Sequence, residues 1–122
     1  MHKVLIVEDS TIFRTLLQET LKSRFPSMEI FEAADGKGAM EEIRAHSPDI
    51  IFMDIKLPGE NGLDLTTKIK TKYPDLVVII LTSYDTPEYR EAAVQAKANH
   101  FLAKGSSSKE LILALVESIL EG

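Results

Sequence analysis

Five polar side chains of the kinds that bind metal ions and phosphoryl groups each follow a short apolar run of the sequence. The acids are Glu8, Asp9 and Asp54, and the other two residues are Thr82 and Lys104. The preceding apolar runs cover residues 4–7, 50–53, 76–81 and 101–103. In a parallel α/β sheet the carboxyl ends of all strands lie along one edge, so residues far apart in sequence can share one pocket there. Three carboxylates beside a hydroxyl and an ammonium group suit a divalent metal ion and a phosphoryl group.

The elements expected to position these side chains are five repeats of an apolar run followed by a segment of helical periodicity. Thr86 followed by Pro87 is typical of a helix start, and Ser107 with Glu110 matches a capping box. In the first helix, the spacing of Ile12, Leu16 and Thr20 beside Phe13, Leu17 and Leu21 predicts a stripe that faces the core. The predicted helices cover roughly residues 10–24, 36–46, 62–72, 86–97 and 107–120.

The order of the strands follows from their polarity. The runs at 4–7, 50–53 and 76–81 are continuously apolar, as central strands covered on both faces must be, whereas residues 28–32 and 99–101 include polar side chains that suit the edges. With right-handed crossovers, the simplest arrangement is strand order 2-1-3-4-5. We therefore predict one α/β domain over residues 1–122, a (βα)5 flavodoxin-like, doubly wound parallel sheet. The winding reverses between strands one and three, where Glu8, Asp9 and Asp54 are expected to lie.

The bulk properties exclude several classes of protein. The 122 residues have 44% apolar content and no cysteine, which excludes disulfides and thiolate metal sites. No apolar stretch approaches the roughly 20 residues of a membrane helix, and the first three residues lead directly into a strand without room for a signal peptide. The net charge of -5 argues against this domain alone binding nucleic acid. We expect a cytoplasmic domain that contacts neither a membrane nor nucleic acid directly.

The constellation resembles the response-regulator receiver domain of two-component signalling, of which CheY-like domains are members. The resemblance covers the whole chain, and residues 53–62 (Met-Asp-Ile-Lys-Leu-Pro-Gly-Glu-Asn-Gly) look like the phosphorylation loop of the family. Residues 104–108 (Lys-Gly-Ser-Ser-Ser) are more similar to receivers attached to LuxR/NarL-type DNA-binding domains than to single-domain receivers. Transcriptional control would require a further domain, because nothing in these residues is suited to reading DNA.

The resemblance implies the chemistry of the site. Asp54 would accept a phosphoryl group from a histidine kinase. Glu8, Asp9 and Asp54, with the backbone carbonyl of Lys56, would hold one Mg2+, an ion that prefers oxygen ligands and neutralises charge on the phosphoryl oxygens. Lys104 would place a second positive charge on the same oxygens.

The resemblance also implies a switch. Thr82 would donate its hydroxyl to a phosphoryl oxygen, and Phe101 would move into the space that Thr82 leaves. The change would reach the face formed by the fourth helix, the fifth strand and the fifth helix, which would contact an output domain or a second copy. Lys56 and Tyr84 would flank the mouth of the pocket and influence the lifetime of the phosphate. From the sequence alone, Phe101 fits a plain core residue as well as a switch.

The fifth helix and the loop before it depart from simple expectation. The apolar residues of the helix span an arc of about 200°, whereas about 100° covers a core. Leu113 and Leu120, at the far edge of that arc, are therefore predicted to be exposed or to meet a partner. Gly105 follows Lys104, where the family usually has a proline with a cis peptide bond. Glycine is compatible with a strained cis bond and with a different path of the loop.

Taken singly, each site residue has an ordinary explanation. Glu8 and Asp9 could cap a helix, Asp54 could belong to a turn, Thr82 could end a strand, and Lys104 could be a solvated charge. Their joint placement favours the phosphoacceptor, which we expect to lose its phosphate slowly to water and not to act as an enzyme. Two alternatives are a degenerate receiver that only binds protein and a Mg2+-dependent phosphatase with Asp54 as nucleophile. Phosphatases of the haloacid-dehalogenase type need a second acid where this chain has Lys56.

Overall fold

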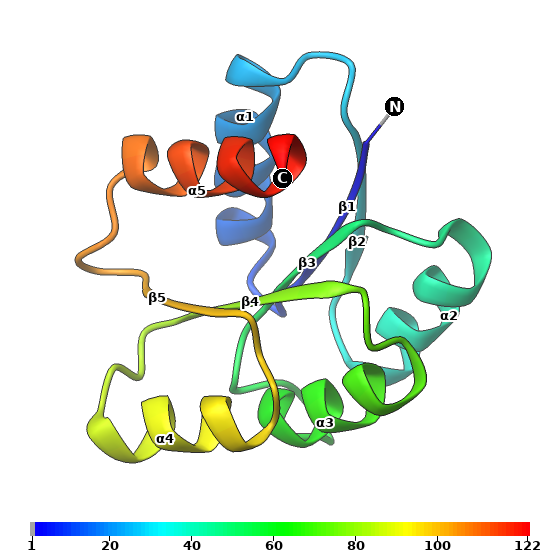
Figure 1. Cartoon of the computed structure of the whole chain (residues 1–122), viewed down its shortest axis with the longest axis vertical. Coiled ribbons are helices and arrows are strands. Elements are labelled where there is room, and N and C mark those ends of the chain that lie inside the picture. The colour runs from blue at the N-terminus through cyan, green and yellow to red at the C-terminus, as the bar shows by residue number, and fades with distance from the viewer. Residues whose placement is uncertain (1) are drawn as a thin grey trace.

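The computed structural model describes residues 2–122, which form five parallel strands and five helices in strict alternation (Figure 1). No helix in this part of the chain has the length and apolar content needed to cross a membrane. The strands and helices have the following bounds: β1 Lys3–Val7, α1 Thr11–Arg24, β2 Glu29–Ala33, α2 Gly36–His46, β3 Ile50–Met53, α3 Gly62–Lys72, β4 Val77–Thr82, α4 Pro87–Gln95, β5 His100–Ala103 and α5 Lys109–Glu121.

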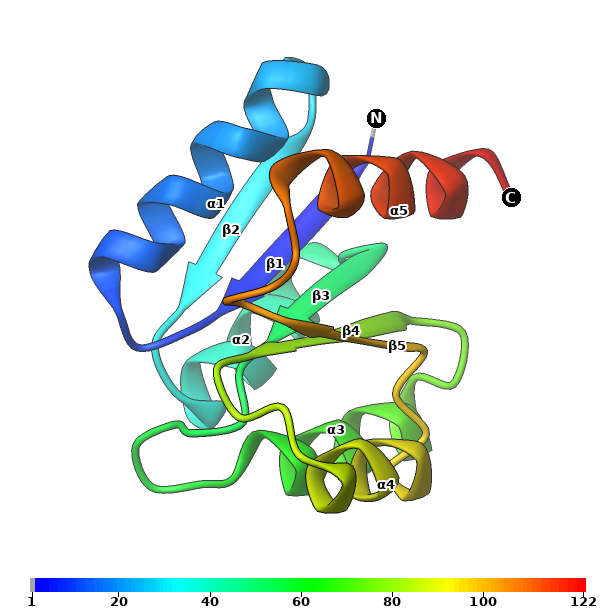
Figure 2. The ribbon, with the colours of Figure 1, turned by 90° about the vertical axis from the view of Figure 1, so that its left-hand side faces the viewer.

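The sheet has the predicted order, β2-β1-β3-β4-β5, so both the fold class and the topology predicted from sequence are confirmed. Helices α1 and α5 cover one face, while α2, α3 and α4 cover the other (Figure 2). The central strands are buried on both faces because their successive side chains enter opposite cores. In β1, Leu5 and Val7 pack with α2 and α3, whereas Val4 and Ile6 pack with α1 and α5.

The parallel register brings the ends of the strands together. Val7 of β1 lies opposite Met53 of β3, and Met53 lies opposite Ile80 of β4. Three backbone hydrogen bonds continue the ladder one step past the strand ends: the N–H of Glu8 to the carbonyl of Ala33 at 3.0 Å, Asp54 to Val7 at 3.0 Å, and Lys104 to Thr82 at 2.8 Å. The backbone that carries the predicted site residues is therefore fixed by the sheet itself.

The starts of α4 and α5 test two caps predicted from sequence. Thr86 caps α4 as predicted, because its hydroxyl accepts the N–H of Tyr89 at 3.2 Å. The prediction for Ser107 is wrong: Ser108 is the cap of α5, and its hydroxyl accepts the N–H of Leu111 at 3.1 Å. The N–H of Ser107 instead donates to the carbonyl of Ala103, which makes Ser107 part of the preceding turn.

The residues that α1 and α5 bury differ from the predicted ones. In α1, Leu17 and Leu21 are buried, but Ile12 and Leu16 are 75% and 52% exposed. In α5, Leu113 is only 4% exposed because that edge of the helix lies beside Thr20 of α1.

The exposed large apolar residue of α5 is Leu111, at the opposite edge of its arc and 48% exposed, while Leu120 is half-buried. The predicted exposure of Leu113 is thus wrong.

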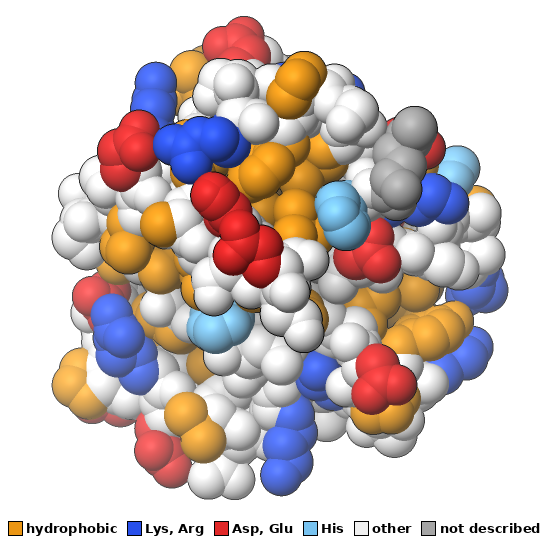
Figure 3. Space-filling view, turned by 45° about the horizontal axis from the view of Figure 1, so that its top comes forward, with side chains coloured by type: hydrophobic (Ala, Val, Ile, Leu, Met, Phe, Trp, Pro, Cys, Tyr) orange, Lys and Arg blue, Asp and Glu red, His pale blue; other side chains and the backbone are white. Residues whose placement is uncertain are grey.

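On the face in Figure 3, apolar side chains lie in patches between charges of both signs.

Hydrogen bonds hold the C-terminal end of α4 in place. At its C-terminal end Lys97 has a left-handed φ of 72°, and the N–H groups of Lys97 and Ala98 donate back to the carbonyls of Val94 and Ala93. The side chain of Asn99 then accepts the N–H of Val78 at 2.9 Å and the ammonium group of Lys70 at 3.0 Å. These bonds tie the end of α4 to both β4 and α3.

Two glycines near the site have contrasting surroundings. A Cβ atom at Gly62, the first residue of α3, would lie 1.9 Å from the carbonyl oxygen of Asp54. A Cβ atom at Gly105 would have no heavy atom within 4 Å. The Lys104–Gly105 peptide bond is trans, so the loop takes a different path from the cis geometry considered above.

We predict that Gly62→Ala lowers the free energy of unfolding by about 1–3 kcal/mol or more, because the methyl group must displace backbone. Gly105→Ala is the matched control and should change the same quantity by less than about 0.5 kcal/mol. Urea unfolding followed by circular dichroism measures both. Equal effects of the two substitutions would contradict the close packing of α3 against Asp54.

Candidate functional site

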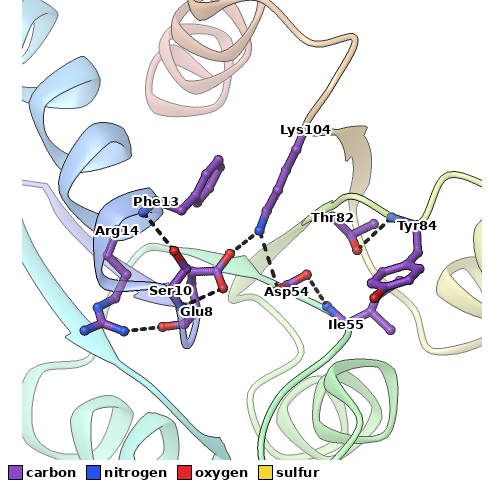
Figure 4. Close-up of polar contacts among 9 residues, drawn as sticks. All are labelled: Glu8, Ser10, Phe13, Arg14, Asp54, Ile55, Thr82, Tyr84 and Lys104. Carbon is purple, nitrogen blue, oxygen red and sulfur yellow. Dashed lines mark hydrogen bonds and ion pairs between the residues drawn. The ribbon is translucent and has the colours of Figure 1, made fainter.

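The ends of β1, β3, β4 and β5 meet in one polar pocket (Figure 4). One carboxylate oxygen each from Glu8, Asp9 and Asp54 lies within 4.8 Å of the others. Glu8 and Asp54 are buried, whereas Asp9 is exposed at the rim. Three acids this close repel one another unless a positive charge lies between them. The predicted set of acids is thus brought together.

Lys104 supplies a positive charge to this pocket. Its ammonium group contacts Glu8 Oε1 and lies 3.5 Å from Asp54 Oδ2. The same group lies 4.1 Å from the centroid of the Phe13 ring, which is within cation–π range. Lys104 therefore spans the pocket from the end of β5, next to the acid of β3 that was predicted to be the phosphoacceptor.

Backbone groups orient the two buried acids. Glu8 Oε2 accepts the N–H of Ser10 at 3.0 Å, and Asp54 Oδ1 accepts the N–H of Ile55 at 2.8 Å. Asp54 Oδ2 is the oxygen that faces Lys104. Each carboxylate thus has one oxygen held by the backbone and the other directed to the lysine.

Arg14 braces the loop that carries Glu8 and Asp9. Its Nη1 donates to the backbone carbonyl of Glu8, and its Nε lies 3.3 Å from Glu32 Oε1. The Nε pair is within ion-pair distance but is not aligned as a hydrogen bond, so its attraction is mainly Coulombic. Through Arg14, α1 fixes the acidic loop against β2.

Thr82 is fully buried at the end of β4, and its hydroxyl oxygen accepts the backbone N–H of Tyr84 at 3.2 Å. Thr82 lies opposite Ala103 in the sheet, and Ile80 lies opposite Phe101. Because side chains two residues apart share a face, Thr82 and Phe101 lie on the same face of the sheet, the face covered by α4. The two residues predicted to form the switch thus lie on one face of the sheet, at the ends of neighbouring strands.

Lys56, two residues past Asp54, lies between two tyrosines. Its ammonium group is 5.2 Å from the ring centroid of Tyr84 and 5.6 Å from that of Tyr89 on α4. Hydrogen bonding to Tyr89, the largest influence, raises the pKa of Lys56 above its ordinary value, helped by the charge interactions with Tyr89 and Tyr84. The backbone of Lys56 is bridged to Asn61, the cap of α3, which closes the loop after Asp54. Lys56 thus joins this loop to α4.

Phe101 of β5 is half-buried, with Arg90 of α4 over its ring. The guanidinium carbon of Arg90 lies 4.7 Å from the ring centroid, and Arg90 Nε donates to Asp85 Oδ1 at 2.5 Å. This hydrogen bond lowers the pKa of Asp85 and raises the pKa of Arg90. Phe101 is therefore in contact with the charged Arg90 as well as with the core.

Phe13, Arg14, Tyr89 and Arg90 were not among the predicted site residues. All four lie in the first turn or so of a helix that follows a site-bearing loop. Because the amino ends of such helices border the carboxyl edge of the sheet, first-turn positions are a signal that sequence reasoning can use.

Comparisons with known proteins agree with this geometry. The family model described as "Response regulator receiver domain" matches residues 4–116. The oxygen regulatory protein NreC of Staphylococcus epidermidis is 33% identical over 121 residues, which are 98% of this chain and 55% of that protein. The chain thus spans about half the length of the curated relatives it matches.

Two solved structures of LuxR-family regulators are also similar. The response regulator from Aurantimonas is 29% identical with a TM-score of 0.89, covering 98% of this chain and 85% of that one. The DNA-binding response regulator from Staphylococcus aureus is 26% identical with a TM-score of 0.81, covering 98% of both chains. With the family model matching nearly the whole chain, this protein belongs to the response regulator receiver domain family.

Proposed function

We propose that this domain is the phosphoacceptor of a two-component pathway and that Asp54 receives the phosphoryl group from a histidine kinase. The observation that carries the proposal is the convergence of Glu8, Asp9, Asp54 and Lys104 on one pocket. Asp54 Oδ1 is held by the N–H of Ile55, which leaves Oδ2 as the oxygen to form the new bond. The ammonium group of Lys104 lies 3.5 Å from Oδ2. As a compact positive charge, it would pair with the oxygens of the transferred phosphoryl group.

Receiver domains bind Mg2+ at an acidic pocket, and we propose that Glu8, Asp9 and Asp54 hold the ion here. An all-oxygen donor set is the kind that Mg2+ prefers, and the backbone carbonyl of Lys56 would add a further oxygen. When bound, the ion supplies charge neutralisation for phosphoryl transfer. Glu8 is also in contact with the Lys104 ammonium group, so the ion and Lys104 would compete for the same carboxylate.

The relay would run from Thr82 to Phe101. Thr82 would give up the N–H of Tyr84 and donate its hydroxyl to a phosphoryl oxygen, and Phe101, on the same face of the sheet, would occupy the space left. Lys56 and Tyr84 at the pocket mouth would govern the access of water, and hence slow loss of the phosphate.

The output surface would be the α4–β5–α5 face. It carries two exposed apolar side chains, Val94 on α4 at 65% and Leu111 on α5 at 48%. The curated relatives are about twice as long as this chain. A separate solved structure of similar length comes from a LuxR-family regulator described as DNA-binding. A LuxR-type output domain or a second copy is therefore the proposed partner of this face. The complete acidic set disfavours a binding-only receiver, and Lys56 disfavours a phosphatase.

We predict that Mg2+ and acetyl phosphate add the mass of one phosphoryl group to the wild-type domain, and that Asp54→Asn abolishes the adduct. Asp64→Asn is the matched control, because Asp64 is an exposed acid of α3 outside the pocket. Intact-protein mass spectrometry measures the adduct. An adduct that persists in Asp54→Asn would place the acceptor elsewhere, and rapid turnover of many phosphate monoesters would favour a phosphatase.

A second prediction concerns the ion itself. Above its dissociation constant, Mg2+ should raise the free energy of unfolding by about 1.4 kcal/mol per tenfold increase in concentration. Asp9→Asn should flatten this dependence, while stabilising the metal-free domain by relieving repulsion among the acids. Urea unfolding across a Mg2+ series measures both effects, with Glu41→Gln on the exposed side of α2 as the control. Wild-type stability that does not respond to Mg2+ would contradict the proposed metal site.

A further inference from the structure

We propose that Arg90 and Asp85 form a latch that holds Phe101 in its present, half-buried position and so opposes activation. Arg90 is a positioning residue in this proposal, acting through Phe101 and touching neither the metal nor the phosphoryl group. The inference rests on the proposed function, since it concerns how the same site is regulated. Two hydrogen bonds, one peptide link and one cation–π contact connect Thr82 to Phe101 through the loop before α4.

The first contact joins the latch to the site. Thr82 Oγ1 accepts the N–H of Tyr84, and Asp85 is the next residue in the same short loop between β4 and α4. If Thr82 Oγ1 moves toward a phosphoryl oxygen, its hydrogen bond with the N–H of Tyr84 is lengthened or broken, and the loop would shift with it. Asp85 would then be displaced by the same event that empties the space beside Phe101.

The second contact joins Asp85 to the aromatic ring. Arg90 Nε donates to Asp85 Oδ1, and its guanidinium carbon lies 4.7 Å from the centroid of Phe101. The hydrogen bond fixes the guanidinium over the ring, where the attraction between the cation and the ring face favours the present position. Inward movement of Phe101 would remove the ring from the cation, so this contact contributes only to the inactive arrangement.

The arrangement explains why an exposed ion pair matters here. A surface pair such as Asp85 and Arg90 contributes little to stability by itself. Its effect on the switch does not depend on stability, because a contact present in only one of two states shifts the equilibrium between them. Loss of the latch should therefore favour the active state while leaving the fold intact.

The test uses Arg90→Gln, with Arg44→Gln as the matched control, because Arg44 is an exposed arginine on α2 and α3 lies between α2 and α4 (Figure 1). Ring signals of labelled phenylalanine, assigned with Phe101→Leu, report the position of Phe101 without any phosphate. Arg90→Gln should shift the Phe101 signals and tighten Mg2+-dependent binding of beryllofluoride by about two- to fivefold. Arg90→Lys, which keeps the charge, should restore part of the wild-type behaviour.

A thermodynamic cycle separates the latch from general effects. In a Phe101→Leu background the ring is absent, so Arg90→Gln should no longer change beryllofluoride affinity. If Arg90→Gln behaves like Arg44→Gln, or if its effect persists in that background, the latch is wrong. If the wild-type domain binds no beryllofluoride, the phosphoacceptor proposal fails instead, and the Phe101 ring signals still decide whether Arg90 positions the ring.

Discussion

Repulsion among Glu8, Asp9 and Asp54, whose oxygens lie within 4.8 Å of one another, is the constraint on which the rest of this sheet edge depends. Backbone hydrogen bonds from neighbouring strands prevent the acids from moving apart. The ammonium group of Lys104 compensates part of the charge, and Phe13 covers it. The sheet thus maintains an electrostatically unfavourable arrangement that a bound cation would relieve, a common cost of a functional site.

The pocket is connected to the α4 side of the molecule by three separate contacts. The backbone N–H of Tyr84 donates to the hydroxyl of Thr82. Lys56 lies between the rings of Tyr84 and Tyr89. Arg90 lies over the ring of Phe101. All three involve α4 or the loop that leads to it. Under the proposed function, a change at the site would reach one helix through contacts that differ in chemistry and can be altered independently.

The strand order and the identity of the converging residues were predictable, because apolar runs identify central strands and parallel strands share one carboxyl edge. The exposure of Leu111 and the burial of Leu113 were not. Periodicity gives the width of an apolar arc but not the edge that meets a neighbour, and here Thr20 of α1 decides it. The contacts of Tyr89 and Arg90 likewise depend on how α4 lies across β5, which no local pattern records.

The unequal anchoring of α4 has a mechanical consequence. Its C-terminal end is hydrogen-bonded to β4 and α3 through residues 97–99, whereas the side chains of Tyr89 and Arg90 near its start are held by packing and cation–π contacts. Because hydrogen bonds secure the C-terminal end, a rotation of the helix would be centred on that end. We therefore expect displacement of α4 to grow from a pivot at Lys97 toward Pro87, so that a partner bound near the free end would sense the largest motion.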